Sequence, residues 1–314
     1  MRITLARFSR ITSGYLAVFR LKLLLSTALT TLAGALYAFY SMGDLDLNLL
    51  PLLAILILGT TLAHIAMHAL DDYLDVIEGL DKGLSKDLYT VFGYYYSPVV
   101  EGRISLRETL VVAIVAFIGA FAIGVYLALE RGILVLLFAL AGAAIILSYH
   151  SLLLAVAPGE LALLAKDMLV FTGSYYVIAR EIDVLTFIPA IAVSTAHIVY
   201  SLNKVPRASY DREKKRKTLP SILGQKFWIG YLSMTFLTVT TLIACTALNL
   251  MPHSILVALA PATLTLLIGL KLRAVESMNI PALKKLSDLN QLALLVYKVF
   301  IIAGLALALT ASHI

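Results

Sequence analysis

Nine apolar segments of about twenty residues each follow one another along this chain of 314 residues. A stretch of that length crosses the hydrocarbon core of a bilayer. Hydrophobic residues make up 61% of the chain and charged residues only 14%, which is more apolar surface than a soluble core of this size needs. The sequence therefore predicts an all-α polytopic membrane protein, a bundle of nine transmembrane helices with a polar cytoplasmic cap. The segments lie at roughly 20–42, 49–70, 108–129, 132–152, 160–180, 184–203, 227–248, 253–272 and 289–312.

Basic residues indicate how the bundle is oriented, because loops kept in the cytoplasm are enriched in Lys and Arg. Most of the 25 Lys and Arg residues fall in the first 22 residues and in alternate connections, at 71–107, 204–226 and 271–288. The connections on the opposite side hold only Arg131 and Arg180. We therefore expect a multi-pass protein of the plasma membrane with its N-terminus and polar loops in the cytoplasm and its C-terminus outside.

The rest of the chain adds no second domain. Residues 1–19 have the composition of a basic amphipathic leader lying on an anionic membrane face rather than of a signal peptide, so residues 1–314 are expected to form a single integral membrane domain. The single cysteine, Cys245, excludes an intramolecular disulfide. The net charge of +6 follows mainly from the bias of the cytoplasmic loops, so we expect no nucleic-acid partner.

Carboxylates are concentrated after the second segment, in "HALDDYLDVIEGLDKG" at residues 68–83. On a continuing helix, Asp71, Asp75 and Glu78 share one face and Asp72 lies three residues before Asp75. Like charges at this spacing repel each other, so a divalent cation is the natural compensator, and Mg²⁺ prefers oxygen ligands that it shares with substrate phosphates. Gly79 would let the chain turn and bring Asp81 toward the same ion. The alternative is a solvated acidic loop balanced by neighbouring lysines.

Bases are concentrated after the sixth segment, in "NKVPRASYDREKKRKTLPSILG". Six basic groups surround Asp211, which suits an anionic ligand such as diphosphate. The alternative is a run of positive charge that only fixes topology. Together the two loops indicate more than either does alone, because recognition of a diphosphate needs acids that bind metal and cations that bind phosphate directly.

Other polar residues lie within the apolar segments. His64 and His68 are four residues apart with Asp72 the next step along that face, a pattern that fits either a metal-binding stripe or polar helix contacts. Lys166, Asp167 and Lys298 fall inside expected spans, where ionisable residues are rare and usually face a cavity or a partner. They fit either local pairing or contact with a substrate.

At the two loops the sequence resembles the UbiA superfamily of intramembrane prenyltransferases. "DDYLDVIEGLD" is similar to the first motif of the dihydroxynaphthoate (menaquinone-pathway) branch, N-D-Y-x-D-x-x-x-G-x-D, with Asp71 in place of Asn. The second loop resembles N-x-x-x-D-x-x-x-D-R-x-x-G-K-x-T-L and keeps Asn203, Asp211, Arg212, Thr218 and Leu219. The resemblance runs from about residue 19 to residue 225.

Three positions depart from the family pattern. Arg207 stands where the second motif has its first Asp, Ser97 replaces an Arg before Pro98, and Lys215 replaces a Gly. The change at Arg207 removes an expected Mg²⁺ ligand. Either the second metal site uses Asp211 with water and diphosphate, or Arg207 binds diphosphate itself, or catalysis is impaired.

The resemblance implies a bundle of nine helices that uses Mg²⁺ to transfer an isoprenoid chain from its diphosphate to an acceptor, in a membrane environment. The residues that it implies for catalysis are Asp72, Asp75, Asp211 and Arg212. The metal ligands that it implies are Asp71, Asp72, Asp75, Asp81 and Asp211. The residues that it implies for binding substrate are Arg20, Lys22, Asn203, Arg207 and Lys217.

The acceptor is expected to be an aromatic precursor of a quinone. A glycerophosphate lipid precursor is an alternative, and so is a transporter or a non-catalytic paralogue that binds isoprenoid diphosphate. The sequence leaves the acceptor, the prenyl chain length and the oligomeric state open.

Overall fold

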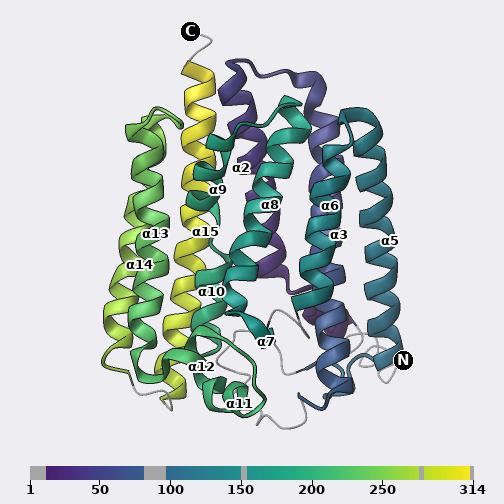
Figure 1. Ribbon diagram of the computed structural model, residues 1–314, viewed down its shortest axis with the longest axis vertical. Helices are drawn as coiled ribbons and strands as arrows, with labels where there is room; N and C mark the ends of the chain where they lie inside the picture. Colours follow the sequence, from purple (N-terminus) through teal and green to yellow (C-terminus); the bar gives the residue numbers. More distant parts are fainter. Residues whose placement is uncertain (1–11, 81–96, 150–153, 276–278, 312–314) are drawn as a thin grey trace, which may run out of the picture.

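The computed structural model describes residues 12–80, 97–149, 154–275 and 279–311, and these residues form a bundle of roughly parallel and antiparallel helices (Figure 1). Among them, eight helical segments are long and apolar enough to cross a membrane. Helical structure suits such apolar segments, because a helix satisfies its backbone hydrogen bonds internally and so tolerates hydrocarbon. The protein is a polytopic, all-helical membrane protein.

The eight segments follow the sequence prediction closely. Their bounds are Leu21–Met42 (α2), Leu47–Ile77 (η1, Leu47–Leu49, and α3, Leu50–Ile77), Leu106–Arg131 (α5), Gly159–Ala179 (α8), Val184–Asn203, Leu219–Ala247, His253–Leu272 and Ile280–Ala311 (α15). The expected span at 132–152 corresponds to α6, Leu134–Ser148, which has 15 residues and is shorter than the other eight. The ninth crossing therefore stays a prediction.

In two spans a single helix is longer than the apolar pattern alone predicts. α3 continues through Asp71, Asp72 and Asp75 to Ile77, and α15 begins at Ile280, nine residues before its expected start. A membrane helix can carry polar side chains at its ends, because the ends lie outside the hydrocarbon. The extension of α3 places the acids on a regular helix rather than in a loop.

The span at Val184–Asn203 is discontinuous. It consists of η4 (Val184–Thr186), α9 (Phe187–Val193) and α10 (Ala196–Asn203), and Ser194 and Thr195 interrupt the helix between α9 and α10. Neither residue is Gly or Pro, so the sequence offers no sign of the break. The backbone N–H groups that the break releases need partners from elsewhere in the bundle.

The second polar connection folds into short helices at one end of the bundle. These are η5 (Val205–Arg207), α11 (Ala208–Glu213) and α12 (Leu219–Leu223), followed by η6 (Gly224–Lys226) and α13 (Phe227–Ala247). Figure 1 shows α11 and α12 below the bundle, at the end opposite the C-terminus. The remaining elements are α7 (Leu154–Val156), η7 (His253–Ala258) and α14 (Leu259–Leu272).

Close contact between α2 and α8 holds the middle of the bundle together. Gly34 permits it, because a Cβ there would lie 2.4 Å from the carbonyl oxygen of Phe171. Small residues at such crossings are typical of membrane helices. Tyr37, Phe171 and Tyr175 pack next to this contact in the main apolar core.

Candidate active site

The carboxylates of the first motif lie on the last turns of α3. Asp72 and Asp75 are each only 7% exposed, and Asp71 is partly buried. Buried carboxylates need charged or hydrogen-bonding partners, because an isolated ion in a low dielectric is costly. Asp81 lies outside the described residues.

Arg20 is the partner of Asp72. Its guanidinium donates to Asp72 Oδ1 at 2.5 Å and lies 3.6 Å from Asp71 Oδ2. Arg20 immediately precedes α2 and has a left-handed backbone (φ 48°), which a residue with a side chain rarely adopts. This strained turn, between helical residues 12–19 and α2, directs the side chain toward α3.

Arg20 also contacts the histidine stripe that the sequence singled out. Its Nη1 lies 2.9 Å from His68 Nδ1, and an arginine can only donate, so Nδ1 accepts and His68 carries its hydrogen on Nε2. That hydrogen points to Tyr200 Oη, 2.9 Å away. Among the described residues, no three or more His, Cys, Asp or Glu side chains form a group that could hold a metal ion. His68 therefore orients Arg20 in this structure.

The second motif surrounds Asp211, which is fully buried in α11. Arg207 Nε donates to Asp211 Oδ1 at 2.9 Å, one helical turn away, and Thr218 Oγ1 donates to Oδ2 at 3.3 Å. Thr218 also caps α12 by a capping box with Ser221. The arginine that departs from the family pattern is thus the ion-pair partner of the remaining aspartate.

Arg216 joins the two motifs. Its Nη1 lies 3.2 Å from Asp75 Oδ1, and its backbone N–H donates to the carbonyl oxygen of Asp211. Tyr210 adds a second link by donating to the carbonyl oxygen of Leu80 at 2.8 Å. The structure therefore brings together the two loops that are far apart in the sequence, as their complementary charges predict.

Three of the expected binding residues, and Arg212 of the expected catalytic residues, make other contacts. Arg212 and Lys217 are exposed and donate to the carbonyl oxygens of Ser221 and Val156, and Lys22 is exposed on the first turn of α2. Asn203 is buried, where Ser287 donates to its side-chain oxygen and its Nδ2 has no hydrogen-bond partner among the described residues. Arg216, which in the sequence is only one base in a run, is the one that pairs with Asp75.

Lys204 is a buried residue that lies beside the two loops. Lys204 Nζ donates to Tyr149 Oη at 2.9 Å and lies 4.0 Å from Glu160 Oε1, while Glu160 Oε2 accepts from the backbone of Leu219. Burial alone would lower the pKa of Lys204, but Tyr149 and Glu160 raise it above its ordinary value. Lys204 is therefore held as a cation that anchors α8 to the second loop.

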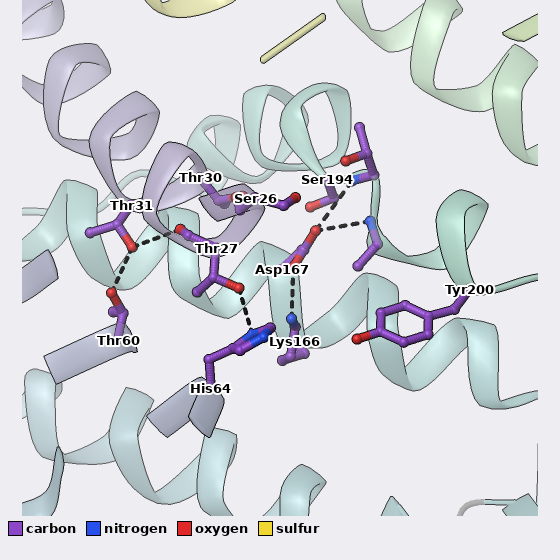
Figure 2. Close-up of polar contacts among 12 residues, drawn as sticks. Ser26, Thr27, Thr30, Thr31, Thr60, His64, Lys166, Asp167, Ser194 and Tyr200 are labelled. Carbon is purple, nitrogen blue, oxygen red and sulfur yellow. Dashed lines mark hydrogen bonds and ion pairs between the residues drawn. The ribbon is translucent and has the colours of Figure 1, made fainter. Parts of the chain in front are cut away.

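A cluster of charged residues around Asp167 lies within the bundle (Figure 2). Asp167 of α8 accepts from the backbone N–H groups of Thr195 and Ala196, at 3.2 and 3.0 Å, where the helix between α9 and α10 is broken. Lys166 Nζ lies 3.1 Å from Asp167 Oδ1 and Lys298 Nζ lies 3.6 Å from Oδ2. Asp167 thus accepts hydrogen bonds from the backbone N–H groups at the break and also pairs with both lysines.

An apolar cavity of about 330 Å³ lies between α2, α3, α5, α6 and α8. Its walls are almost entirely aliphatic and aromatic. Polar groups enter it chiefly where Thr27, His64 and Lys166 line it. His64 lies two helical turns before Asp72, about 12 Å along α3 at 1.5 Å per residue.

The acids of the first motif fit a hard divalent cation. Asp72 and Asp75 present buried carboxylate oxygens on one helix face, and Asp71 Oδ1 is a buried oxygen with no hydrogen-bond partner among the described residues. Mg²⁺ commonly takes one or two such carboxylates and completes its shell with water and substrate phosphates. Asp211 fits less directly, because Arg207 and Thr218 engage its two oxygens.

Comparison with known proteins identifies the family. The family model described as the UbiA prenyltransferase family matches residues 27–287. No curated protein matches the sequence at a significant level.

Solved structures share the fold across nearly the whole chain. The apo structure of a UbiA homolog from Aeropyrum pernix K1 matches with a TM-score of 0.64 and 18% identity, over 90% of this chain and 97% of that one. A UbiA homolog from Archaeoglobus fulgidus bound to DMAPP and Mg²⁺ matches with a TM-score of 0.58 and 17% identity, over 92% and 99%. A structure described as that of digeranylgeranylglyceryl phosphate synthase matches with a TM-score of 0.58 and 14% identity, over 94% and 98%. At these identities the likeness is one of fold.

Proposed function

Since this chain belongs to the UbiA prenyltransferase family and is a transferase of prenyl groups, we propose that it moves an isoprenoid chain from its diphosphate to an aromatic precursor of a quinone. The motif around Asp72, Tyr73 and Asp75 supports the dihydroxynaphthoate branch as the nearest one. The proposal includes nine membrane crossings in a single domain, with α6 as the ninth, and cytoplasmic polar loops in the plasma membrane.

The observation that carries the proposal is the meeting of the two signature loops. Arg216 bonds to Asp75 through its side chain and to Asp211 through its backbone, so acids and arginines are interleaved at one end of the bundle. Diphosphate binding requires this combination, because metal-binding carboxylates and direct cationic donors must both reach the same ligand.

We propose that the arginines exchange partners when the diphosphate binds. Arg20, Arg207 and Arg216 are each paired with a carboxylate in this structure. A diphosphate offers these guanidinium groups a more highly charged acceptor of matching bidentate geometry. The carboxylates that they release are then available as metal ligands. Those ligands would be Asp71, Asp72, Asp75, Asp81 and Asp211, with Arg212, Lys22, Lys217 and Asn203 as outer supporting groups.

Mg²⁺ bound at these carboxylates would neutralise the charge that develops on the diphosphate as it leaves. Arg20, Arg207 and Arg216 would hold the same oxygens by hydrogen bonds. The allylic carbon–oxygen bond breaks and its electron pair leaves with the diphosphate. The acceptor ring then forms a carbon–carbon bond with its own π electrons and loses a proton, or carbon dioxide where a carboxylate occupies that position. The apolar surroundings of the bundle keep water from the allylic cation.

A second candidate rests on Arg207. Because this arginine occupies the place of an expected aspartate and engages Asp211, a paralogue that binds isoprenoid diphosphate but turns it over poorly is the alternative that an observation favours. A glycerophosphate lipid precursor as acceptor, or transport of the diphosphate, has no comparable support in the described residues.

The experiment that tests the proposal is Mg²⁺-dependent release of diphosphate by the purified protein in detergent. Geranyl through geranylgeranyl diphosphates are offered with aromatic acceptors and with glycerol 1-phosphate. We expect release that depends on an aromatic acceptor and that Asp75→Ala abolishes, since Asp75 is both a buried carboxylate proposed to bind metal and the anchor of Arg216. Asp44→Ala, an exposed aspartate at the other end of the bundle, is the matched control. Tight diphosphate binding without release under any acceptor would contradict the proposal and favour the paralogue.

A further inference from the structure

The two lysines that pair with Asp167 differ in how many of their hydrogen-bond donors have partners. Lys298 is fully buried, and its Nζ lies within 2.6–3.2 Å of Thr30 Oγ1, Ser26 Oγ and the Ser26 carbonyl oxygen, as well as 3.6 Å from Asp167. Its three N–H donors are therefore fully occupied. Lys166 has only Asp167 as a polar partner among the described residues. An ammonium group carries three donors, so two of those on Lys166 are unused.

His64 supplies a second unused polar atom in the same place. It is 4% exposed, its Nδ1 bonds to Thr27 Oγ1 at 2.9 Å, and its Nε2 has no hydrogen-bond partner among the described residues. Both His64 and Lys166 line the apolar cavity, and Figure 2 shows the Lys166 amine between Asp167 and the His64 ring. Buried polar groups with unused hydrogen-bonding capacity are rare and costly, so the His64 Nε2 atom without a partner and the unused donors of Lys166, facing one cavity, point to a ligand.

The charge of the cluster selects the kind of ligand. Two ammonium groups face the single carboxylate of Asp167, which leaves an excess of positive charge inside the membrane. The rest of the cavity is apolar. A ligand that satisfies both parts carries one anionic oxygen group on an apolar body, and a cavity of about 330 Å³ is large enough for a bicyclic aromatic ring.

We propose that Lys166, with His64 and Thr27, binds the acidic group of the prenyl acceptor. This inference rests on the proposed function. The position suits it, because His64 lies about 12 Å along α3 from Asp72, which leaves room between them for the acceptor and for the allylic end of an isoprenoid diphosphate bound at Asp72. Lys166 is then a residue that determines acceptor specificity, and Asp167 positions it.

The test compares two probes of nearly equal shape, 1-hydroxy-2-naphthoate and its primary amide, by calorimetric titration of the purified protein in detergent. The wild type is expected to bind the acid at least about tenfold more tightly, the scale of one charge-assisted hydrogen bond. Lys166→Met should abolish that preference and leave binding of the amide unchanged. Lys166→Arg should retain it. Lys271→Met makes the same change at an exposed site on α14 and should behave as wild type. Equal affinity of the wild type for both probes, or equal loss of both in Lys166→Met, would overturn the proposal.

A second variant tests whether the cavity holds the acceptor or the isoprenoid tail. Gly142 lines the cavity, and a Cβ there meets no atom within 4 Å, so Gly142→Leu fills the space without a clash at its base. We expect it to weaken binding of 1-hydroxy-2-naphthoate by at least about tenfold and to leave binding of geranylgeranyl diphosphate with Mg²⁺ unchanged. Weaker binding of the diphosphate with unchanged binding of the naphthoate would assign the cavity to the tail and overturn the inference.

The two proposals fail separately. Absence of any Mg²⁺-dependent diphosphate binding in the wild type would contradict the proposed function, while a Lys166-dependent preference for the acid would still establish the anion site. Normal diphosphate binding with no preference between acid and amide would leave prenyl transfer standing and overturn the acceptor site.

Discussion

At the scale of single residues, Arg207 decides how the second loop treats the diphosphate. It stands one turn before Asp211 and neutralises it at 2.9 Å, so Asp211 can be buried completely without a metal ion. An aspartate at position 207 would instead place two carboxylates on the same helix face, which repel each other without a cation between them. With arginine at position 207 the loop would bind a diphosphate directly through a cation, whereas with aspartate it would bind the diphosphate through a metal ion.

Arg207→Asp should therefore weaken diphosphate binding in this protein. The variant loses a guanidinium that we assign to the diphosphate and gains a negative charge next to Asp211, so we expect the dissociation constant for geranyl diphosphate, with saturating Mg²⁺, to rise about tenfold or more. Binding is measured by calorimetry. Glu213→Ala, an exposed charge in the same short helix, serves as control. If turnover rises instead, Arg207 is an inhibitory replacement and the paralogue interpretation is right.

The sequence predicted the identity of the acids better than that of their partners. The spacing of Asp71, Asp75 and Glu78 indicated one helix face, and the structure has Asp71 and Asp75 on α3 with Glu78 as its C-cap. Arg216 was not singled out, because neighbouring bases in a run are equivalent in sequence and only the fold of α11 and α12 directs one of them at Asp75. Arg20 was expected from the family resemblance, but its contact depends on a left-handed turn that no side-chain pattern encodes.

At the scale of elements, the break between α9 and α10 is held by a residue from another helix. Asp167 of α8 accepts from the two N–H groups at the start of α10, where a negative charge is also favoured by the helix dipole. Helix breaks are usually predicted from Gly or Pro, and residues 194–195 contain neither. The sequence showed that Asp167 was unusual inside a span, yet its role depends on the long-range packing of α8 against α10.

Asp167→Asn should destabilise the protein strongly. The amide can still accept from the backbone of α10, but Lys166 and Lys298 lose their counter-charge inside the bundle. Removing one member of a buried ion pair typically costs about 3–5 kcal/mol. We expect a loss of that size in the free energy of unfolding, measured by titration with sodium dodecyl sulfate in mixed micelles.

Two further variants make this prediction specific. Asp44→Asn makes the same chemical change at an exposed position and should leave the free energy of unfolding unchanged within about 0.5 kcal/mol. Adding Lys298→Met to Asp167→Asn removes one unpaired cation and should recover part of the loss. If Asp167→Asn is as stable as wild type, the cluster does not hold the α9–α10 break in the way that the contacts indicate.

At the scale of the whole molecule, hydropathy was sufficient to locate the spans, because length and apolar composition alone decide whether a helix can lie in hydrocarbon. It was insufficient at the ends of α3 and α15, which continue as helices beyond the apolar stretch. It also gave no warning that α6 has only 15 residues. Orientation in the membrane depends on the basic loops, all of which were predicted to face one side, and Figure 1 places α11 and α12 at the end opposite the C-terminus.

The charge distribution predicts that the end carrying α11 faces the cytoplasm. The single cysteine, Cys245, is buried in α13, so Cys245→Ala gives a background in which one new cysteine reports its own side of the membrane. Glu213→Cys, exposed in α11, should react with a membrane-impermeant maleimide only in inverted vesicles. Asp44→Cys, exposed after α2 at the other end, should react in intact cells. The reverse pattern would place the arginine-paired acids outside the cell, where the protein would lack access to cytoplasmic isoprenoid diphosphates, and would contradict both the orientation and the proposed reaction.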